Sequence, residues 1–297
     1  MKKSDLIIGS LVTIMWGANF SVIEMGLKAL DPFTLTFLRF LCAAVPAIFF
    51  VPRPKEIAIT YLALYGTLFG AGTWWVVNFA MYNGLSAGLS SIFLQFSAFF
   101  TIVLSKIFFK EKINFIHVTG MTLSVIGLIG IFLLSHEPST AMGIVLVLLA
   151  AGSWATCNLI VKSQKPANMI AFIVWSSAFS APAIFVMTIV VRGVEPFLSI
   201  KDNLTMPATV SVLFQAYVTT ILGYMVWNNL MKKYPSSAVA PLSLLVPISG
   251  MLSSYLFLDE RIGEYQFAAI SLVIVGIGVF MNAGRILSLL KPEPASV

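Results

Sequence analysis

The amino-acid sequence predicts an all-α polytopic membrane protein, on three observations: its composition, a series of long apolar runs and a repeat within the chain. Hydrophobic residues make up 59% of the 297 residues and charged residues only 10%. That charged share is well below the roughly 25% that is usual for soluble proteins. The mean hydropathy is +0.95. A chain of this composition is expected to fold in a lipid bilayer.

The apolar runs are long enough to cross the hydrocarbon core, which takes about 20 helical residues. They predict ten transmembrane helices with mostly short connections. The expected bounds are 6–27, 33–51, 59–82, 87–109, 114–134, 141–162, 168–191, 208–231, 236–258 and 264–285.

The basic residues predict the orientation. Of the 18 lysines and arginines, 13 fall in connections on one side of the membrane and 4 on the other, with Arg39 inside the second helix. Because lysine and arginine accumulate in cytoplasmic loops, both termini are predicted to be cytoplasmic. The net charge is +6, but the basic residues occur in twos and threes between apolar runs and form no extended basic surface. A nucleic-acid partner is therefore not expected.

A repeat divides the chain into two halves. "FKEKI" at 109–113 recurs as "LDERI" at 258–262, a shift of 149 residues, and "WGANF" at 16–20 aligns with "WATCN" at 154–158. Two five-helix repeats follow, 1–134 and 141–285, with a short cytoplasmic tail at 286–297. Since five is odd, the second repeat must cross the membrane in the opposite sense, as in many secondary transporters. Chance similarity of apolar helices is the alternative.

These segments resemble the EamA-type transporters of the drug/metabolite transporter superfamily. The resemblance is carried by "WGANF", by "LRF" at 38–40, by "FLQFSAFFTIVLSKIFFKEKI" at 93–113 and by "VAPLSLLVPISGMLSSYLFLDERI" at 239–262. The last two, with "VWSS" at 174–177, are most similar to the subgroup that exports O-acetylserine and cysteine. The resemblance implies ten helices in inverted repeats, a bacterial inner membrane, a small-molecule cargo and coupling to protons.

Aromatic and amide side chains lie together inside several predicted helices, where leucine would suit contact with lipid. We expect them to face a central cavity at the repeat interface, where rings would attract an ammonium group and amides would meet a carboxylate. The alternative is helix packing, in which Gly17 permits close approach and the amides bridge helices. The residues are Trp16, Asn19, Trp74, Trp75, Asn78, Trp154, Asn158, Tyr224, Trp227 and Asn228.

The fourth and ninth helices are expected to line the other side of this cavity. Gln95 interrupts the fourth, and Pro241 and Pro247 interrupt the ninth. A proline disturbs the carbonyl four residues earlier, which for Pro247 is that of Ser243. Such a freed group is tolerated against protein or a water-filled cavity. A kink that serves packing alone is the alternative.

Ionisable groups inside the predicted helices are scarce. Arg39 needs a partner because a charge at this depth is costly, and Glu24 is the nearest candidate in sequence. Glu111 and Glu260, which the repeat aligns, are expected to form local ion pairs or helix caps.

Enzymatic motifs are missing from the sequence. The two histidines, His117 and His136, and the two cysteines, Cys42 and Cys157, have no metal-ligand spacing, and neither a GxSxG elbow nor a P-loop occurs. We therefore expect no enzyme, no metal and no cofactor. The predicted function is export of small polar metabolites, most of all amino acids of the cysteine and O-acetylserine type, by alternating access. A broad drug or other-metabolite exporter, a passive channel and a structural membrane subunit remain as alternatives.

Overall fold

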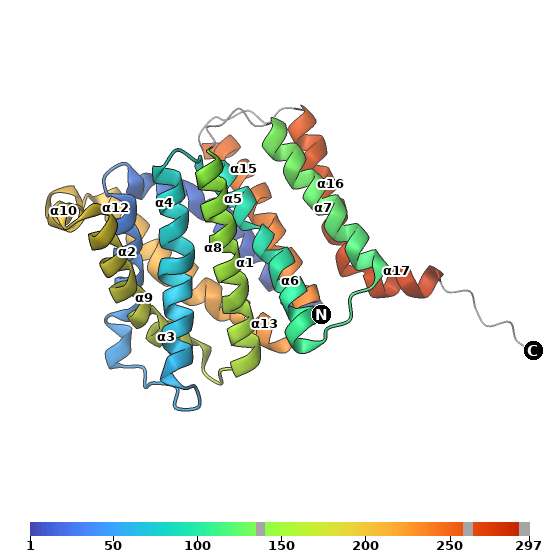
Figure 1. Ribbon diagram of the computed structural model, residues 1–297, viewed down its shortest axis with the longest axis horizontal. Coiled ribbons are helices and arrows are strands. Elements are labelled where there is room, and N and C mark those ends of the chain that lie inside the picture. The colour runs from blue at the N-terminus through green and yellow to red at the C-terminus, as the bar shows by residue number, and fades with distance from the viewer. Residues whose placement is uncertain (135–139, 258–263, 291–297) are drawn as a thin grey trace, which may run out of the picture.

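The computed structural model describes residues 1–134, 140–257 and 264–290, and this part of the chain is helical without any β-strand (Figure 1). The first half contains α1 (Lys3–Leu27), α2 (Pro32–Ala44), η1 (Ala47–Phe49), α3 (Ile59–Thr67), η2 (Leu68–Trp75), α4 (Val76–Tyr82), α5 (Ala87–Leu94), α6 (Phe96–Phe109) and α7 (Phe115–Leu134). The second half contains α8 (Ala141–Gln164), α9 (Met169–Arg192), α10 (Glu195–Leu198), α11 (Ile200–Asn203), α12 (Met206–Leu213), η3 (Phe214–Gly223), α13 (Tyr224–Lys233), α14 (Ser236–Val239), η4 (Ala240–Leu244), α15 (Leu245–Phe257), α16 (Glu264–Met281) and α17 (Ala283–Leu290).

Several helices begin where the sequence supplies a side-chain cap. A side-chain oxygen before the first turn accepts a hydrogen bond from a backbone N–H that would otherwise lack a partner. Asp31 does this for α2 and Asn168 for α9, with proline at the start of α2 as a further helix-initiating residue. Lys110 and Lys165 end α6 and α8 in the left-handed conformation, with φ of 54° and 47°. Short polar connections therefore separate the apolar helices.

Seven helices among the described residues are long and apolar enough to cross a membrane: the first, the second and the fourth to eighth of the predicted series. The tenth predicted helix, 264–285, is instead divided, because α16 ends at Met281 and α17 turns away by 69°. Residues 286–290, predicted as tail, thus belong to a helix. The ninth is divided as well, since Pro241 lies in the 3-10 segment η4 between α14 and α15. The third contains the π-helix η2.

The packing pairs elements of the two halves. α7 runs along α16, and these two lie side by side at one edge of the bundle (Figure 1). Gly127 and Gly276, which the repeat aligns, both lie in this contact. A Cβ on Gly127 would come within 2.6 Å of Val273 Cγ2, and one on Gly276 within 2.4 Å of Ser124 Oγ. The two glycines let the helix backbones approach closely.

Both halves contain a π-helix at corresponding places. The shift of 149 residues carries η2 (Leu68–Trp75) onto 217–224, which overlaps η3 (Phe214–Gly223). Such segments are rare, often occur at functional sites and alter which carbonyls are paired within the helix. In η2, the hydroxyl of Thr73 donates to the Leu68 carbonyl at 3.0 Å. The side chains at the ends of these two π-helices are therefore candidates for a functional site.

Candidate functional site

Four aromatic side chains from three helices meet in the interior, and we call Trp16, Trp154, Tyr224 and Trp227 the aromatic cluster. Trp16 of α1 lies 4.5 Å from Tyr224, 5.4 Å from Trp227 and 5.9 Å from Trp154, measured between ring centroids. All four side chains are buried. Offset and edge-on contacts at these distances stabilise aromatic pairs. The cluster joins the front of each repeat to the end of the second π-helix.

A chain of hydrogen bonds leads away from this cluster. The Trp227 indole donates to Asn158 Oδ1 at 3.0 Å, and Asn158 Nδ2 donates to Thr101 Oγ1 of α6 at 3.1 Å. The Trp16 indole donates to the Thr219 carbonyl of η3 at 3.2 Å. Each polar atom named here is buried, so these bonds orient the rings as well as satisfy their N–H groups.

Tyr65 and Asn228 form a second polar contact beside the cluster. Asn228 Nδ2 donates to the Tyr65 hydroxyl at 3.1 Å. The Tyr65 ring packs on Phe69 at 5.5 Å, and Phe69 in turn lies 4.4 Å from the Tyr224 ring. Asn228 is thus brought to the same region as the predicted Trp16, Asn158 and Trp227, by way of a tyrosine that sequence reasoning did not single out.

Trp75 and Asn78, the first-half counterparts of Tyr224 and Trp227, face other neighbours. The Trp75 indole donates to Thr188 Oγ1 of α9 at 2.9 Å, and its ring stacks on Phe33. Asn78 Nδ2 donates to Thr36 Oγ1 and to the Pro32 carbonyl, both in α2. These two predicted site residues therefore join η2 and α4 to α2 and α9, and neither forms a hydrogen bond or ring contact with the aromatic cluster.

Three further predicted residues, Gln95, Ser243 and Asn19, are buried, whereas Trp74 is partly buried. Gln95 stands between α5 and α6, where its Nε2 donates to the Ser91 carbonyl at 3.1 Å. Ser243 donates to the Ala240 carbonyl within η4. Gln95 Oε1 and Asn19 Oδ1 have no hydrogen-bond partner among the described residues. These two buried amide oxygens thus accept no hydrogen bond from the described residues and remain available to another donor.

A narrow apolar crevice lies between α6, η4, α7 and α16, apart from the aromatic cluster. Its empty volume is about 200 Å³. Its lining consists of Ala98, Phe99, Ile102, Gly120, Met121, Ser124, Pro241, Leu244, Ile277 and Phe280. This lining includes none of the predicted site residues, so the crevice is not the polar cavity that the sequence predicts.

At one end of the bundle, the carboxylate of Glu111 connects segments of the two repeats. Glu111 lies 2.5 Å from Lys162 Nζ of α8 and accepts hydrogen bonds from the Ser236 and Ser237 N–H groups at the start of α14. Lys162 also donates to the Tyr234 carbonyl at 3.2 Å. The expected ion pair and helix cap are therefore both present, but the partners come from the other repeat. Glu260, its counterpart, lies outside the described residues.

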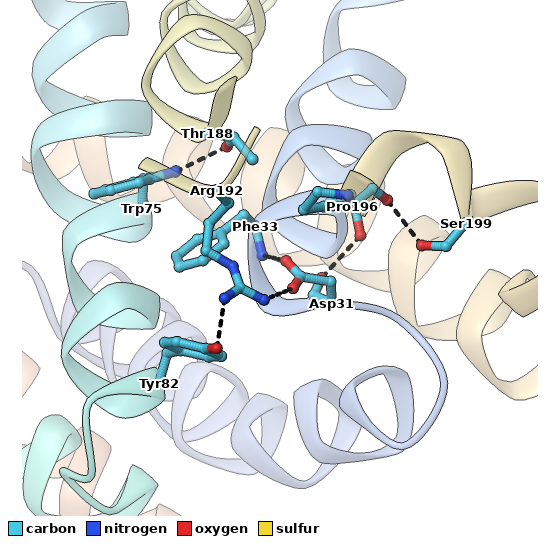
Figure 2. Close-up of polar contacts among 9 residues, drawn as sticks. Asp31, Phe33, Trp75, Tyr82, Thr188, Arg192, Pro196 and Ser199 are labelled. Atoms are coloured by element: carbon cyan, nitrogen blue, oxygen red, sulfur yellow. Dashed lines mark hydrogen bonds and ion pairs between the residues drawn. The ribbon is translucent and has the colours of Figure 1, made fainter. Parts of the chain in front are cut away.

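The opposite end has a different polar contact, shown in Figure 2. Arg192 at the end of α9 donates to the Tyr82 hydroxyl at 2.5 Å and pairs with Asp31 at 3.5 Å. Asp31 Oδ1 also caps α2 through the Phe33 N–H. This contact holds together the ends of α4 and α9 and the start of α2.

Comparisons with known proteins identify the family to which this chain belongs. The EamA-like transporter family matches residues 4–133 and again residues 141–282. The chain belongs to this family, which confirms the resemblance seen in the sequence and its two-repeat organisation.

The curated relatives are similar over nearly their whole length. A protein named "Probable amino-acid metabolite efflux pump" from Escherichia coli K12 is 35% identical over 93% of this chain and 94% of its own. A protein of the same name from Salmonella typhimurium LT2 is 36% identical, and the match covers 96% of this chain and 97% of that protein. A solved crystal structure with 16% identity covers 96% of this chain and 99% of its own with a TM-score of 0.73, which supports the fold.

Proposed function

We propose that this protein is a secondary-active exporter of small polar metabolites, most of all amino acids of the cysteine and O-acetylserine type. The observation that carries the proposal is the aromatic cluster with its amide and hydroxyl partners, built from α1, α8 and α13. It brings side chains of both repeats into contact, and secondary transporters bind cargo at the interface between their repeats. The relatives named amino-acid metabolite efflux pumps supply the cargo class.

The chemistry of the cluster suits a small zwitterion. Tryptophan and tyrosine faces attract an ammonium group by about 0.5–2 kcal/mol each, and Asn158 and Asn228 offer amide groups nearby. The rings touch one another, so a cargo must separate them. We expect this to occur as the two repeats move against each other in alternating access. Modest binding of this kind lets a carrier release its cargo.

The test is transport by the purified protein in liposomes. Uptake of labelled cysteine should saturate with concentration and should accelerate when unlabelled cysteine or O-acetylserine is present on the opposite side. A linear dependence without acceleration would point to a passive channel. Transport of bulky lipophilic cations, with none of the amino acids, would favour a broad drug exporter. A dependence on a pH gradient would identify protons as the coupling ion.

Ten membrane spans with both termini in the cytoplasm of a bacterial inner membrane complete the proposal. The hydrogen bonds support the charge-based grouping of loops: Asp5 pairs with Lys233 at 2.6 Å, and the Ala167 N–H donates to Glu56 at 3.2 Å. Connections that belong to the lysine-rich side thus meet at one end.

Cysteine labelling tests this topology. With Cys42 and Cys157 replaced, a cysteine at the exposed Lys201 should react with an impermeant reagent added to intact cells. A cysteine at the exposed Lys55 should react only after the cells are opened. The reverse pattern would contradict the orientation, and reaction at both positions in intact cells would contradict the span count.

A further inference from the structure

Arg39 of α2 is a buried cation beside the aromatic cluster, and the function proposed above does not use it. Only 2% of the residue is exposed. Its Nε donates to Thr220 Oγ1 of η3 at 2.8 Å. Its guanidinium carbon lies 4.3 Å from the Trp74 ring centroid at the end of η2. It also lies 5.4 Å from the Phe40 ring centroid, so the guanidinium is held between the two π-helices by two aromatic faces and one hydroxyl.

The terminal amino groups of this guanidinium are not engaged by the described side chains. Among the described residues, no carboxylate forms an ion pair with Arg39. The one hydrogen bond that its side chain donates to these residues goes to Thr220 Oγ1. Glu24, the partner suggested by sequence, has a side chain outside the described set. A buried charge requires an opposite charge or several hydrogen bonds. One hydroxyl and two aromatic faces supply only part of this compensation, so an acceptor with negative charge would be stabilised here.

The guanidinium is adjacent to the cluster. Thr220 follows Thr219, whose carbonyl accepts the Trp16 indole hydrogen bond. Phe40, which the guanidinium faces, packs on Phe69, and Phe69 packs on Tyr224 of the cluster. Trp74 Nε1, beside the same guanidinium, is buried and has no hydrogen-bond partner among the described residues. One cation and one unpaired indole donor thus adjoin a group of aromatic faces.

We propose that Arg39 binds the α-carboxylate of the cargo while the aromatic cluster holds its ammonium group. The inference rests on the proposed function and names the group that selects its substrates. A guanidinium presents parallel N–H donors that match a carboxylate in two hydrogen bonds. Under this proposal, the cargo site that the sequence predicts from aromatic and amide groups also carries one fixed positive charge. Such a site favours monocarboxylates over molecules that carry only an amine.

The discriminating measurement compares two cargoes that differ only in this group. Initial uptake of labelled L-cysteine and of L-cysteinamide is measured in liposomes that contain the purified protein, under reducing conditions. The wild type should prefer cysteine at least tenfold. In Arg39→Gln the ratio of cysteine uptake to cysteinamide uptake should fall at least tenfold. The carboxylate of cysteine loses its guanidinium partner, whereas cysteinamide has no carboxylate that depends on this partner. Arg39→Lys, which keeps the charge but not the fork, should lower the ratio about threefold.

The matched control is Arg192→Gln, which removes an arginine at the end of α9 and should leave the ratio unchanged. If Arg39 serves only to pack α2 against η3, both rates will fall together and the ratio will stay at the wild-type value, which overturns the inference. Should Arg39→Gln fail to fold, the lysine variant and the wild-type preference still decide. A wild type that transports cysteine and cysteinamide equally refutes the carboxylate site alone, whereas one that transports neither refutes the proposed function as well.

Discussion

The segment from η2 to α4 and its repeat counterpart from η3 to α13 both pass from a π-helix into an α-helix, yet their indoles bond to different partners. Trp227 donates to Asn158 in the aromatic cluster, whereas Trp75 donates to Thr188 of α9. Asn78 is bound to α2, while Asn228 is bound to Tyr65. The backbone repeats, but the side-chain surroundings do not.

The difference follows from what packs beside each segment. α2 brings Thr36 and the Pro32 carbonyl to Asn78, and such acceptors satisfy an amide in the interior. α13 instead packs beside α1 and α8, whose Trp16 and Trp154 supply aromatic faces. The two repeats therefore share a backbone pattern, while three of the four rings of the aromatic cluster come from the second half.

The comparison can be tested most sharply by removing one indole N–H from each segment. Trp227→Phe should lower transport per folded molecule at least tenfold, because Asn158 and the ring are no longer oriented. Trp75→Phe should instead cost about 1–3 kcal/mol of stability, because Thr188 loses its donor and the smaller ring leaves space beside Phe33, with transport within twofold of the wild type. Cysteine uptake in liposomes and thermal unfolding in detergent measure the two effects. Equal transport losses would remove the distinction between the segments.

The front of the two repeats offers a second contrast. Gly17 aligns with Ala155, yet a Cβ on Gly17 would come within 1.8 Å of Ser249 Oγ and 2.4 Å of the Val246 carbonyl. Gly17→Ala should therefore destabilise the α1 contact with α15 by about 1–3 kcal/mol through overpacking. Gly152→Ala is the control, since nothing lies within 4 Å of its Cβ position. Unfolding temperatures of the two variants that coincide would show that the α1 contact adjusts without cost.

The polar contacts at the two ends should differ in strength. Glu111 and Lys162 have side chains only 12% and 14% exposed, whereas the Arg192 side chain is 33% exposed. Glu111→Gln should lower stability by about 1 kcal/mol, since it removes a partly buried ion pair and weakens the cap of α14. Arg192→Gln should cost less, and its effect should shrink further at high salt. A larger loss for Arg192→Gln would reverse this order.

A loss of stability of similar size, with little effect on transport, is expected at Asn78, whose amide donates to α2. Asn78→Ala removes hydrogen bonds to α2 and should lower stability by about 0.5–1.5 kcal/mol, while transport per folded molecule stays within twofold. Binding of cysteine, followed by the shift in unfolding temperature that it causes, should persist. Loss of binding without loss of stability would return Asn78 to the cargo site that the sequence predicts.

The sequence by itself determined the helical membrane fold, the family and the two repeats, because these follow from properties that are local or periodic along the chain. Apolar length predicts helices, and "WGANF" and "LDERI" identify the repeats. The break of the ninth helix at Pro241 could also be expected from the sequence, since proline lacks the backbone donor. The turn after Met281 could not, because "MNAGR" has no proline and the bend is a matter of packing.

Only the tertiary structure decided which predicted polar residues come together. Trp16, Trp154, Tyr224 and Trp227 meet, while Trp75 and Asn78 turn to α2 and α9. Their sequence signals are equivalent, an aromatic or amide side chain within an apolar run. Thr101, Thr219 and Tyr65 gave no signal at all, because a threonine or tyrosine within such a run is common. Hydrogen bonds over 57 to 203 residues of separation select among these side chains, and such contacts depend on how helices from the two halves pack.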